Sequence, residues 1–170
     1  MADEQPRPAI QVIGPTDGAA WLGGFAVYKV LGDATGGAFA VVEHTLAPHT
    51  LAAPLHTHHD VDELSYVLEG TIGVRIGAQE VAAGPGTFVL KPKGIAHTFW
   101  NAGATPARLL ELIWPAGFER YFEELDGLFR RMVGQPDPVQ VVQLAAQYGM
   151  ELDWGSVPGL LEQYGVTLGG

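Results

Sequence analysis

Three residues of the segment HTHHDVDELSYVLEG have the types and spacing of ligands for one metal ion. His56 and His58 are two residues apart, so on an extended strand both side chains leave from the same face, while His59 leaves from the other. A polar turn at residues 60–62 precedes Glu63, which begins an apolar run. A return of the chain at this turn would bring the carboxylate beside the two imidazoles.

A fourth ligand is predicted in the segment GPGTFVLKPKGIAHTFWN, at His97. Pro92 suits the second position of a type I turn and Gly94 its fourth, which would reverse the chain just before His97. Three neutral imidazoles and one carboxylate suit a first-row divalent ion, and leave one or two coordination positions open for chemistry. The sequence therefore predicts a divalent transition metal, which could be Fe, Ni, Mn, Co, Cu or Zn, bound by His56, His58, Glu63 and His97.

A closed structural zinc site is disfavoured, because such sites are usually rich in cysteine and this chain has none. The lack of cysteine also excludes disulfides and thiolate chemistry. The metal site is thus expected to be of the open, catalytic kind.

The remaining histidines are not expected to bind the metal. The strand parity of His59 directs it away from the ion, to the surface or to an outer position around the site. His44 and His49 fit no motif, and the sequence assigns them no role.

Two aromatic residues beside His97 are expected to differ in environment. Phe99 has the strand parity of His97 and is predicted to form a wall of a substrate pocket, with ordinary core packing as the alternative. Trp100 has the opposite parity and is expected to pack outside the barrel.

The elements that must position these residues are mostly short strands. Turn clusters rich in glycine and proline recur between Gly24 and Trp114, a rhythm typical of an all-β sandwich or barrel. Strands are predicted at residues 25–31, 38–46, 63–68, 71–76, 87–90, 97–100 and 107–114.

Helical periodicity replaces the strand pattern after Pro115. Aromatic and leucine side chains recur at helical spacing over residues 118–129. A second helix is predicted to begin after an Asp137 N-cap and to end at Gly149, and a short third helix to end at Gly165.

The spacing of the first three ligands resembles the first motif of the cupin superfamily. The sequence reads His56-x-His58, four residues, Glu63, six residues and Gly70. One position differs, because Thr50 stands where that motif usually opens with glycine.

The second motif of the same superfamily is matched at each of its fixed positions. The sequence reads Gly86, five residues, Pro92-x-Gly94, two residues, His97, three residues and Asn101. Further similarity to single-domain cupins related to quercetin dioxygenases runs over residues 18–130.

The resemblance implies an all-β fold with a helical C-terminal extension, namely a cupin barrel, also called a double-stranded β-helix or jelly roll. Residues 1–8 are expected to form a disordered tail, residues 9–116 the barrel with its N-terminal strands, and residues 117–170 helices that pack on the barrel within the same domain.

The resemblance also implies a metal-dependent dioxygenase that acts on a flavonol or another enolisable aromatic substrate with O2. In quercetinases the substrate hydroxyl binds the metal as an oxyanion, and Glu63 would be both ligand and catalytic base. Two alternatives remain open: a metal-dependent isomerase, lyase or hydrolase of a small hydroxy or keto compound, and a non-catalytic cupin that binds a small ligand.

The charge of the chain limits its partners. Nine Lys and Arg against nineteen Asp and Glu give a net charge of −10, which disfavours nucleic acids and anionic membranes. The polar start of the sequence does not have the pattern of a signal peptide, so a cytoplasmic location is expected.

A homodimer is expected from the resemblance, because related cupins bury an apolar outer sheet face between two subunits. Leu64, Tyr66 and Leu68 would form such a face here, although the C-terminal helices could cover it instead.

Overall fold

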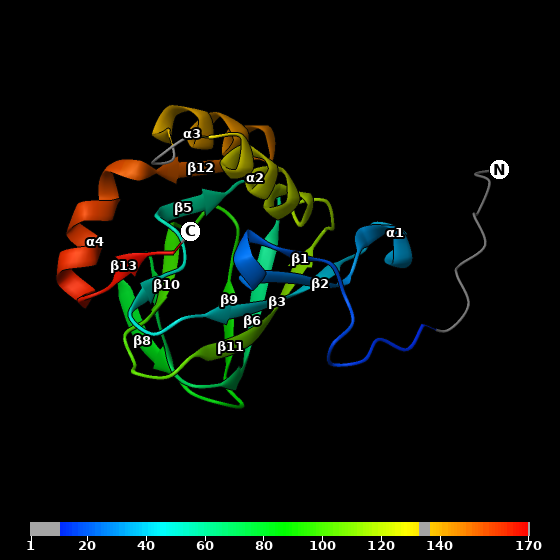
Figure 1. Ribbon diagram of the computed structural model, residues 1–170, viewed down its shortest axis with the longest axis horizontal. Coiled ribbons are helices and arrows are strands. Elements are labelled where there is room, and N and C mark those ends of the chain that lie inside the picture. The colour runs from blue at the N-terminus through cyan, green and yellow to red at the C-terminus, as the bar shows by residue number, and fades with distance from the viewer. Residues whose placement is uncertain (1–10, 133–136, 170) are drawn as a thin grey trace.

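Two β-sheets face each other and enclose the interior of a barrel, as the computed structural model shows (Figure 1). The structure describes residues 11–132 and 137–169. The tail predicted at residues 1–8 lies outside the described residues.

The first sheet has six antiparallel strands in the order β1-β2-β3-β11-β6-β9. In that order the strands are Ala20–Trp21, Ala26–Val30, Ala40–Leu46, Ala107–Trp114, Asp62–Glu69 and Phe88–Lys91.

The second sheet follows the order β12-β5-β10-β4-β13, and β7 joins it by pairing with β10 and with β8. These strands are Met150–Asp153, Leu55–His58, His97–Asn101, Thr50–Leu51 and Thr167–Leu168, with β7 at Ile72–Ile76 and β8 at Gln79–Ala83. The pairing of β13 with β4 is parallel, and the other pairings are antiparallel.

All seven strands predicted from the sequence are present, with ends shifted by at most two residues. The predicted strands do not include β1, β4, β5, β8, β12 and β13, although the extended conformation assumed for residues 56–58 agrees with β5. Five of these six strands are only two to four residues long, too short to display an alternating pattern.

Strand alternation places polar residues on the inner face of the first sheet. On β6 the buried positions include Glu63, Ser65 and Val67, and on β11 they include Leu109 and Glu111. Every second side chain of a strand points into the barrel. On β6 and β11 these inward side chains include both apolar core residues and polar site residues.

The helices are α1 at Gly32–Thr35, α2 at Arg120–Arg131, α3 at Pro138–Gln147 and α4 at Val157–Tyr164, with short 3-10 turns η1 at Leu22–Gly24 and η2 at Trp154–Ser156. The three C-terminal helices predicted from the sequence are α2, α3 and α4. As expected, Asp137 caps α3 by accepting a hydrogen bond from the Val139 backbone N–H, and Gly149 and Gly165 follow α3 and α4 with φ of 66° and 63°.

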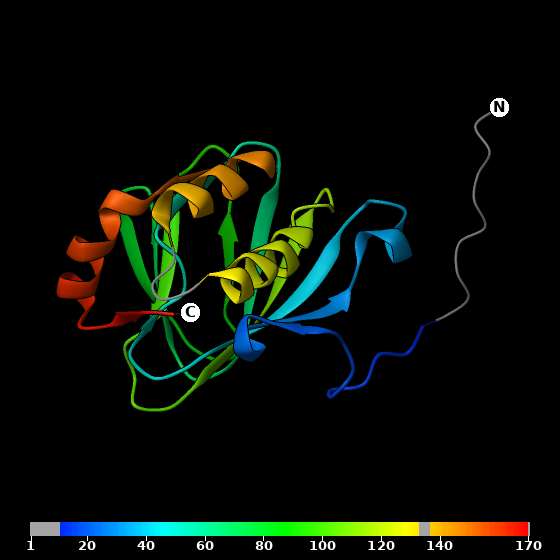
Figure 2. The same cartoon turned by 45° about the horizontal axis from the view of Figure 1, so that its top comes forward.

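The C-terminal helices lie at one end and one side of the barrel (Figures 1 and 2). Helix α2 packs on η1, β1 and α3, helix α3 on β12, and helix α4 on η2 and β13. Within the described residues the main helix contacts do not involve β6, on which Leu64, Tyr66 and Leu68 are partly buried. Whether the helices or a second subunit cover this face stays a prediction.

No helix within residues 11–132 and 137–169 is long and apolar enough to cross a membrane. The cytoplasmic location stays a prediction.

Candidate metal centre and its cavity

Three strands bring the four predicted ligands together. His56 and His58 project from β5, His97 lies opposite His56 on the neighbouring strand β10, and Glu63 projects from β6 in the facing sheet. One potential ligand atom of each residue lies within 4.8 Å of the others, and all four side chains are buried.

The turn before His97 differs in detail from the prediction. Its closing hydrogen bond runs from the Ile95 backbone N–H to the Pro92 carbonyl, at 3.4 Å. Gly94 therefore occupies the third position, with φ of 77°, rather than the fourth position of a type I turn. A positive φ at this position is typical of a type II turn and favours glycine.

Thr50 stands where the first motif usually has glycine, but its backbone does not adopt the left-handed conformation that favours glycine. Thr50 begins strand β4, and the preceding His49 has the positive φ, at 53°.

Backbone carbonyls fix the orientation of two of the imidazoles. His56 Nδ1 lies 2.8 Å from the Pro54 carbonyl, and His97 Nδ1 lies 3.1 Å from the Ile95 carbonyl. A carbonyl only accepts, so each Nδ1 carries the hydrogen and each Nε2 presents its lone pair in the neutral ring. This arrangement is typical of metal-ligating histidines.

His58 provides the direct test of whether a metal fits. Both of its ring nitrogens are buried without a hydrogen-bond partner in the described residues, although Nε2 lies 3.4 Å from Glu63 Oε1. Leaving a buried polar atom unpaired is costly. An ion coordinated by one nitrogen of His58 would remove part of this cost, so the donor set fits a divalent metal.

Burial and charge set the protonation states of the cluster. Burial lowers the pKa of His58 to about 4, and burial together with the neighbouring imidazoles holds the pKa of His56 well below its usual value. Burial alone would raise the pKa of Glu63, but Lys91 and the imidazoles of His58 and His97 hold it well below its usual range. Neutral imidazoles beside a carboxylate are the states that bind metals.

A buried ion-pair network that the sequence analysis missed adjoins Glu63. Lys91 Nζ lies 3.1 Å from Glu63 Oε2 and 2.7 Å from Glu111 Oε2, and the Ser65 hydroxyl also donates to Glu111. Burial raises the pKa of Glu111 to about 7, and the two carboxylates raise the pKa of Lys91. The available signal was strand parity, since Glu111 shares a strand face with the apolar Leu109 and Ile113.

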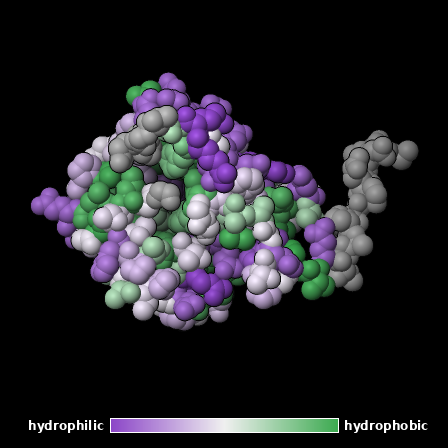
Figure 3. Space-filling view, in the orientation of Figure 1, coloured by the Kyte–Doolittle hydropathy of each residue, from purple (hydrophilic) through white to green (hydrophobic). Residues whose placement is uncertain are grey.

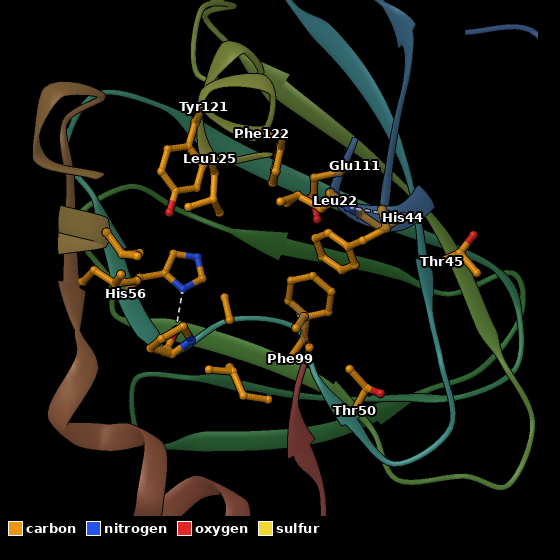
Figure 4. Close-up of a pocket in the computed structure, with 18 of the residues that line it drawn as sticks. Leu22, His44, Thr45, Thr50, His56, Phe99, Glu111, Tyr121, Phe122 and Leu125 are labelled. Carbon is orange, nitrogen blue, oxygen red and sulfur yellow. Dashed lines mark hydrogen bonds between the residues drawn. The ribbon is translucent and has the colours of Figure 1, made fainter. Parts of the chain in front are cut away.

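A cavity of about 580 Å³ opens beside the metal cluster. His56, His58, Glu63, Lys91 and Glu111 line its polar part, and most of the remaining wall is apolar. Figure 4 shows the labelled Tyr121, Phe122 and Leu125 of α2 along one side of the pocket, with Phe99 across from them. Hydrophobic side chains also reach the outer surface of the molecule, in patches beside hydrophilic ones (Figure 3).

The other sequence-predicted side chains lie as follows. Phe99 lines the cavity and is buried. Trp100 lies on the opposite side of β10 and stacks on Tyr164 of α4, with 3.6 Å between ring centroids. His59 is about half exposed and lies 3.8 Å from Glu151, away from the cluster. His44, to which the sequence assigned no role, lines the cavity.

Residues 42–113 match the family model described as Cupin_2, cupin domain. No match was found among curated proteins.

Solved structures similar to this chain come from several bacteria. A proposed sugar phosphate isomerase from Acidithiobacillus ferrooxidans ATCC 23270 is 29% identical with a TM-score of 0.45, over 52% of this chain and 58% of that protein. A predicted oxalate decarboxylase from Thermotoga maritima is 22% identical with a TM-score of 0.49, over 52% and 76%. A protein with a double-stranded β-helix domain from Klebsiella pneumoniae is 17% identical with a TM-score of 0.49, over 62% and 84%.

Proposed function

We propose that this protein, a double-stranded β-helix barrel whose residues 42–113 match the cupin domain, is a metal-dependent dioxygenase. Its substrate would be an enolisable aromatic compound such as a flavonol. The observation that carries the proposal is the position of the cluster of His56, His58, Glu63 and His97. Three of its members line an apolar cavity of about 580 Å³, a size suited to a small aromatic molecule.

The four side chains would hold a divalent transition metal and leave positions open to substrate. When bound, the metal supplies Lewis-acid polarisation of a substrate oxygen and a template that orients the substrate. In a dioxygenation both atoms of O2 enter the product and the substrate supplies the electrons, so no external reductant is required.

Glu63 is proposed as the base that takes the proton of the substrate hydroxyl. One of its oxygens, Oε2, is held by the ammonium group of Lys91 at 3.1 Å. A carboxylate has two oxygens, so it can be oriented through one and accept a proton through the other.

The cavity wall favours an aromatic substrate over a phosphorylated one. Phe25, Phe118 and Phe122 are among the lining residues, and Lys91 is the only Lys or Arg in the described part of that lining. Lys91 is already paired with two carboxylates, so it offers no free positive charge to a phosphate. Away from the metal cluster, a phosphate against this wall would find no free cation in the described lining to pair with its charge, at high cost.

The test is turnover of a flavonol panel by protein reconstituted with each candidate metal, followed by an oxygen electrode and by product mass. Consumption of O2 in step with loss of the flavonol supports the proposal. Turnover without O2 would instead indicate an isomerase, lyase or hydrolase, and flavonol binding without turnover would indicate a non-catalytic cupin.

A further inference from the structure

His44 is a buried polar side chain in the aromatic part of the cavity, and neither the metal cluster nor the ion-pair network uses it. It projects inward from β3 and is 2% exposed. Its ring lies among the rings of Phe25, Phe99 and Phe122, with centroid distances of 4.6, 6.2 and 5.1 Å. All four of these residues line the cavity.

One ring nitrogen of His44 is hydrogen-bonded to the protein backbone. Nδ1 lies 3.2 Å from the Phe25 carbonyl and, because a carbonyl only accepts, Nδ1 carries the hydrogen. Burial lowers the pKa of His44 to about 4, the charge of Lys91 lowers it further, and Glu63 opposes this. The ring is therefore neutral near pH 7, and Nε2 is an acceptor.

The second nitrogen has no partner and faces the cavity. Within the described residues no hydrogen bond involves His44 Nε2. Among the described residues, the side-chain polar atoms that have neither a hydrogen-bond partner nor accessible surface belong to Trp21 and His58. His44 Nε2 is not among them, so this unpaired atom retains accessible surface. Since His44 lines the cavity, its free acceptor opens onto the space that a substrate would fill.

The metal cluster and His44 lie on opposite sides of the pocket. Figure 4 shows His56 at one side of the pocket and His44 at the other, with Phe99 below and Phe122 above the space between them. The cavity therefore has a polar centre at each side and aromatic rings between, which suits a planar molecule with polar groups at both ends.

We propose that His44 Nε2 accepts a hydrogen bond from an O–H or N–H group of the substrate, and so selects aromatic substrates with a donor remote from their metal-binding oxygen. The inference rests on the proposed function in one respect, that this cavity receives the substrate beside the metal cluster. It makes His44 a specificity-determining residue.

Binding without turnover tests this selection. The zinc-loaded protein is titrated under anaerobic conditions with 3,7-dihydroxyflavone and 3,4′-dihydroxyflavone, each compared with the methyl ether of its second hydroxyl, which cannot donate. A net hydrogen bond corresponds to about three- to tenfold in affinity. We expect the wild type to prefer at least one dihydroxyflavone over its ether by about this factor. Absence of any preference, or of any flavonol binding, would overturn the inference.

The variant His44→Phe keeps an aromatic ring but removes the acceptor, so it should bind the hydroxyl compound and the ether equally. His44→Gln, which retains an acceptor oxygen, should keep part of the preference, and His59→Phe should keep all of it. Metal content and circular dichroism should match the wild type in each variant. His44→Leu, which also lacks an acceptor, replaces His44→Phe if that variant does not fold. An unchanged preference after removal of the acceptor would contradict the role of His44.

Oxygen uptake is measured separately, so the two proposals fail in different ways. A preference that depends on His44, without O2 consumption, would refute the dioxygenase and leave the recognition role intact. O2 consumption with equal binding of both compounds would support the dioxygenase and refute the role of His44.

Discussion

Lys91 Nζ and His97 Nε2 both lie 3.1 Å from the same atom, Glu63 Oε2. Lys91 is fully buried, and its second carboxylate partner is Glu111 at 2.7 Å. The structure thus joins the metal cluster to a buried Lys–Glu pair through one carboxylate oxygen. Removing the lysine would leave two carboxylates in a low-dielectric interior with no cation between them.

Lys91→Met should therefore destabilise the protein by about 3 to 5 kcal/mol, the cost typical of breaking a buried ion pair. Urea unfolding under fixed metal loading measures this loss. The double variant Lys91→Met/Glu111→Gln removes one of the stranded charges and should recover part of the stability. The single variant Glu111→Gln completes the comparison. A loss in the double variant equal to the sum of the losses in the two single variants would show that the residues are not coupled.

The sequence could predict the four-residue cluster because its signal is local. His56 and His58 share a strand face, and Glu63 and His97 occupy fixed positions in two short motifs. The existence of most strands followed from turn residues and alternation in the same way. The turn at Pro92 was assigned one residue too early because both proline and glycine fit more than one turn position.

The sequence could not assign His44, Lys91 and Glu111, because their roles depend on neighbours from distant parts of the chain. Lys91 faces Glu111 across β6, and His44 enters an aromatic group that includes Phe122 from α2. Strand parity can show which side chains share a face, but the partners that surround these three residues come together only in the folded barrel.

His58→Ala should strip the metal, whereas His59→Ala should leave metal content near normal. His58 has two unpaired buried nitrogens in the cluster, while His59 lies just after the end of β5 with its side chain about half exposed. We expect the affinity loss for His58→Ala to exceed the roughly 10- to 100-fold typical of losing an outer partner of a ligand. Elemental analysis of protein purified without chelators gives the readout, and equal losses in both variants would contradict the assignment by strand parity.

Glu63→Gln should suppress turnover more strongly than it weakens metal binding. The amide oxygen can still coordinate an ion, but the side chain can no longer take a proton at neutral pH. Loss of a general base typically lowers the rate by about 100-fold or more. Rates are compared at saturating metal, and an unaltered rate there would remove Glu63 as the base.

The homodimer expected from the sequence remains a proposal, and the structure supplies a candidate contact on the outer face of β6, β9 and β11. Leu90 is 53% exposed and pairs in register with Leu64, which in turn pairs with Leu112. A face of this kind can pair with the same face of a second copy about a two-fold axis. Leu90→Glu should then shift the mass measured by light scattering from dimer to monomer.

Val81→Glu is the matched control for the dimer contact. Val81 is 49% exposed on β8, which belongs to the other sheet, so its substitution should leave the dimer intact. A wild type that is monomeric at micromolar concentration would refute the proposal.

The stability of the protein should fall as the pH is lowered below about 6.5, partly because of His44. The pKa of His44 is about 4 in the folded protein, mainly because of burial, against 6.5 for the model group. The unfolded chain therefore binds more protons between these two values, which favours unfolding as the pH falls. At pH 5.5 the contribution of one such group is about 1 kcal/mol relative to pH 7.5. In urea unfolding at these two pH values with equal metal loading, His44→Phe should lose about 1 kcal/mol less stability than the wild type, whereas His59→Phe should follow the wild type. An equal loss in His44→Phe and wild type would show that His44 is not held neutral by the fold.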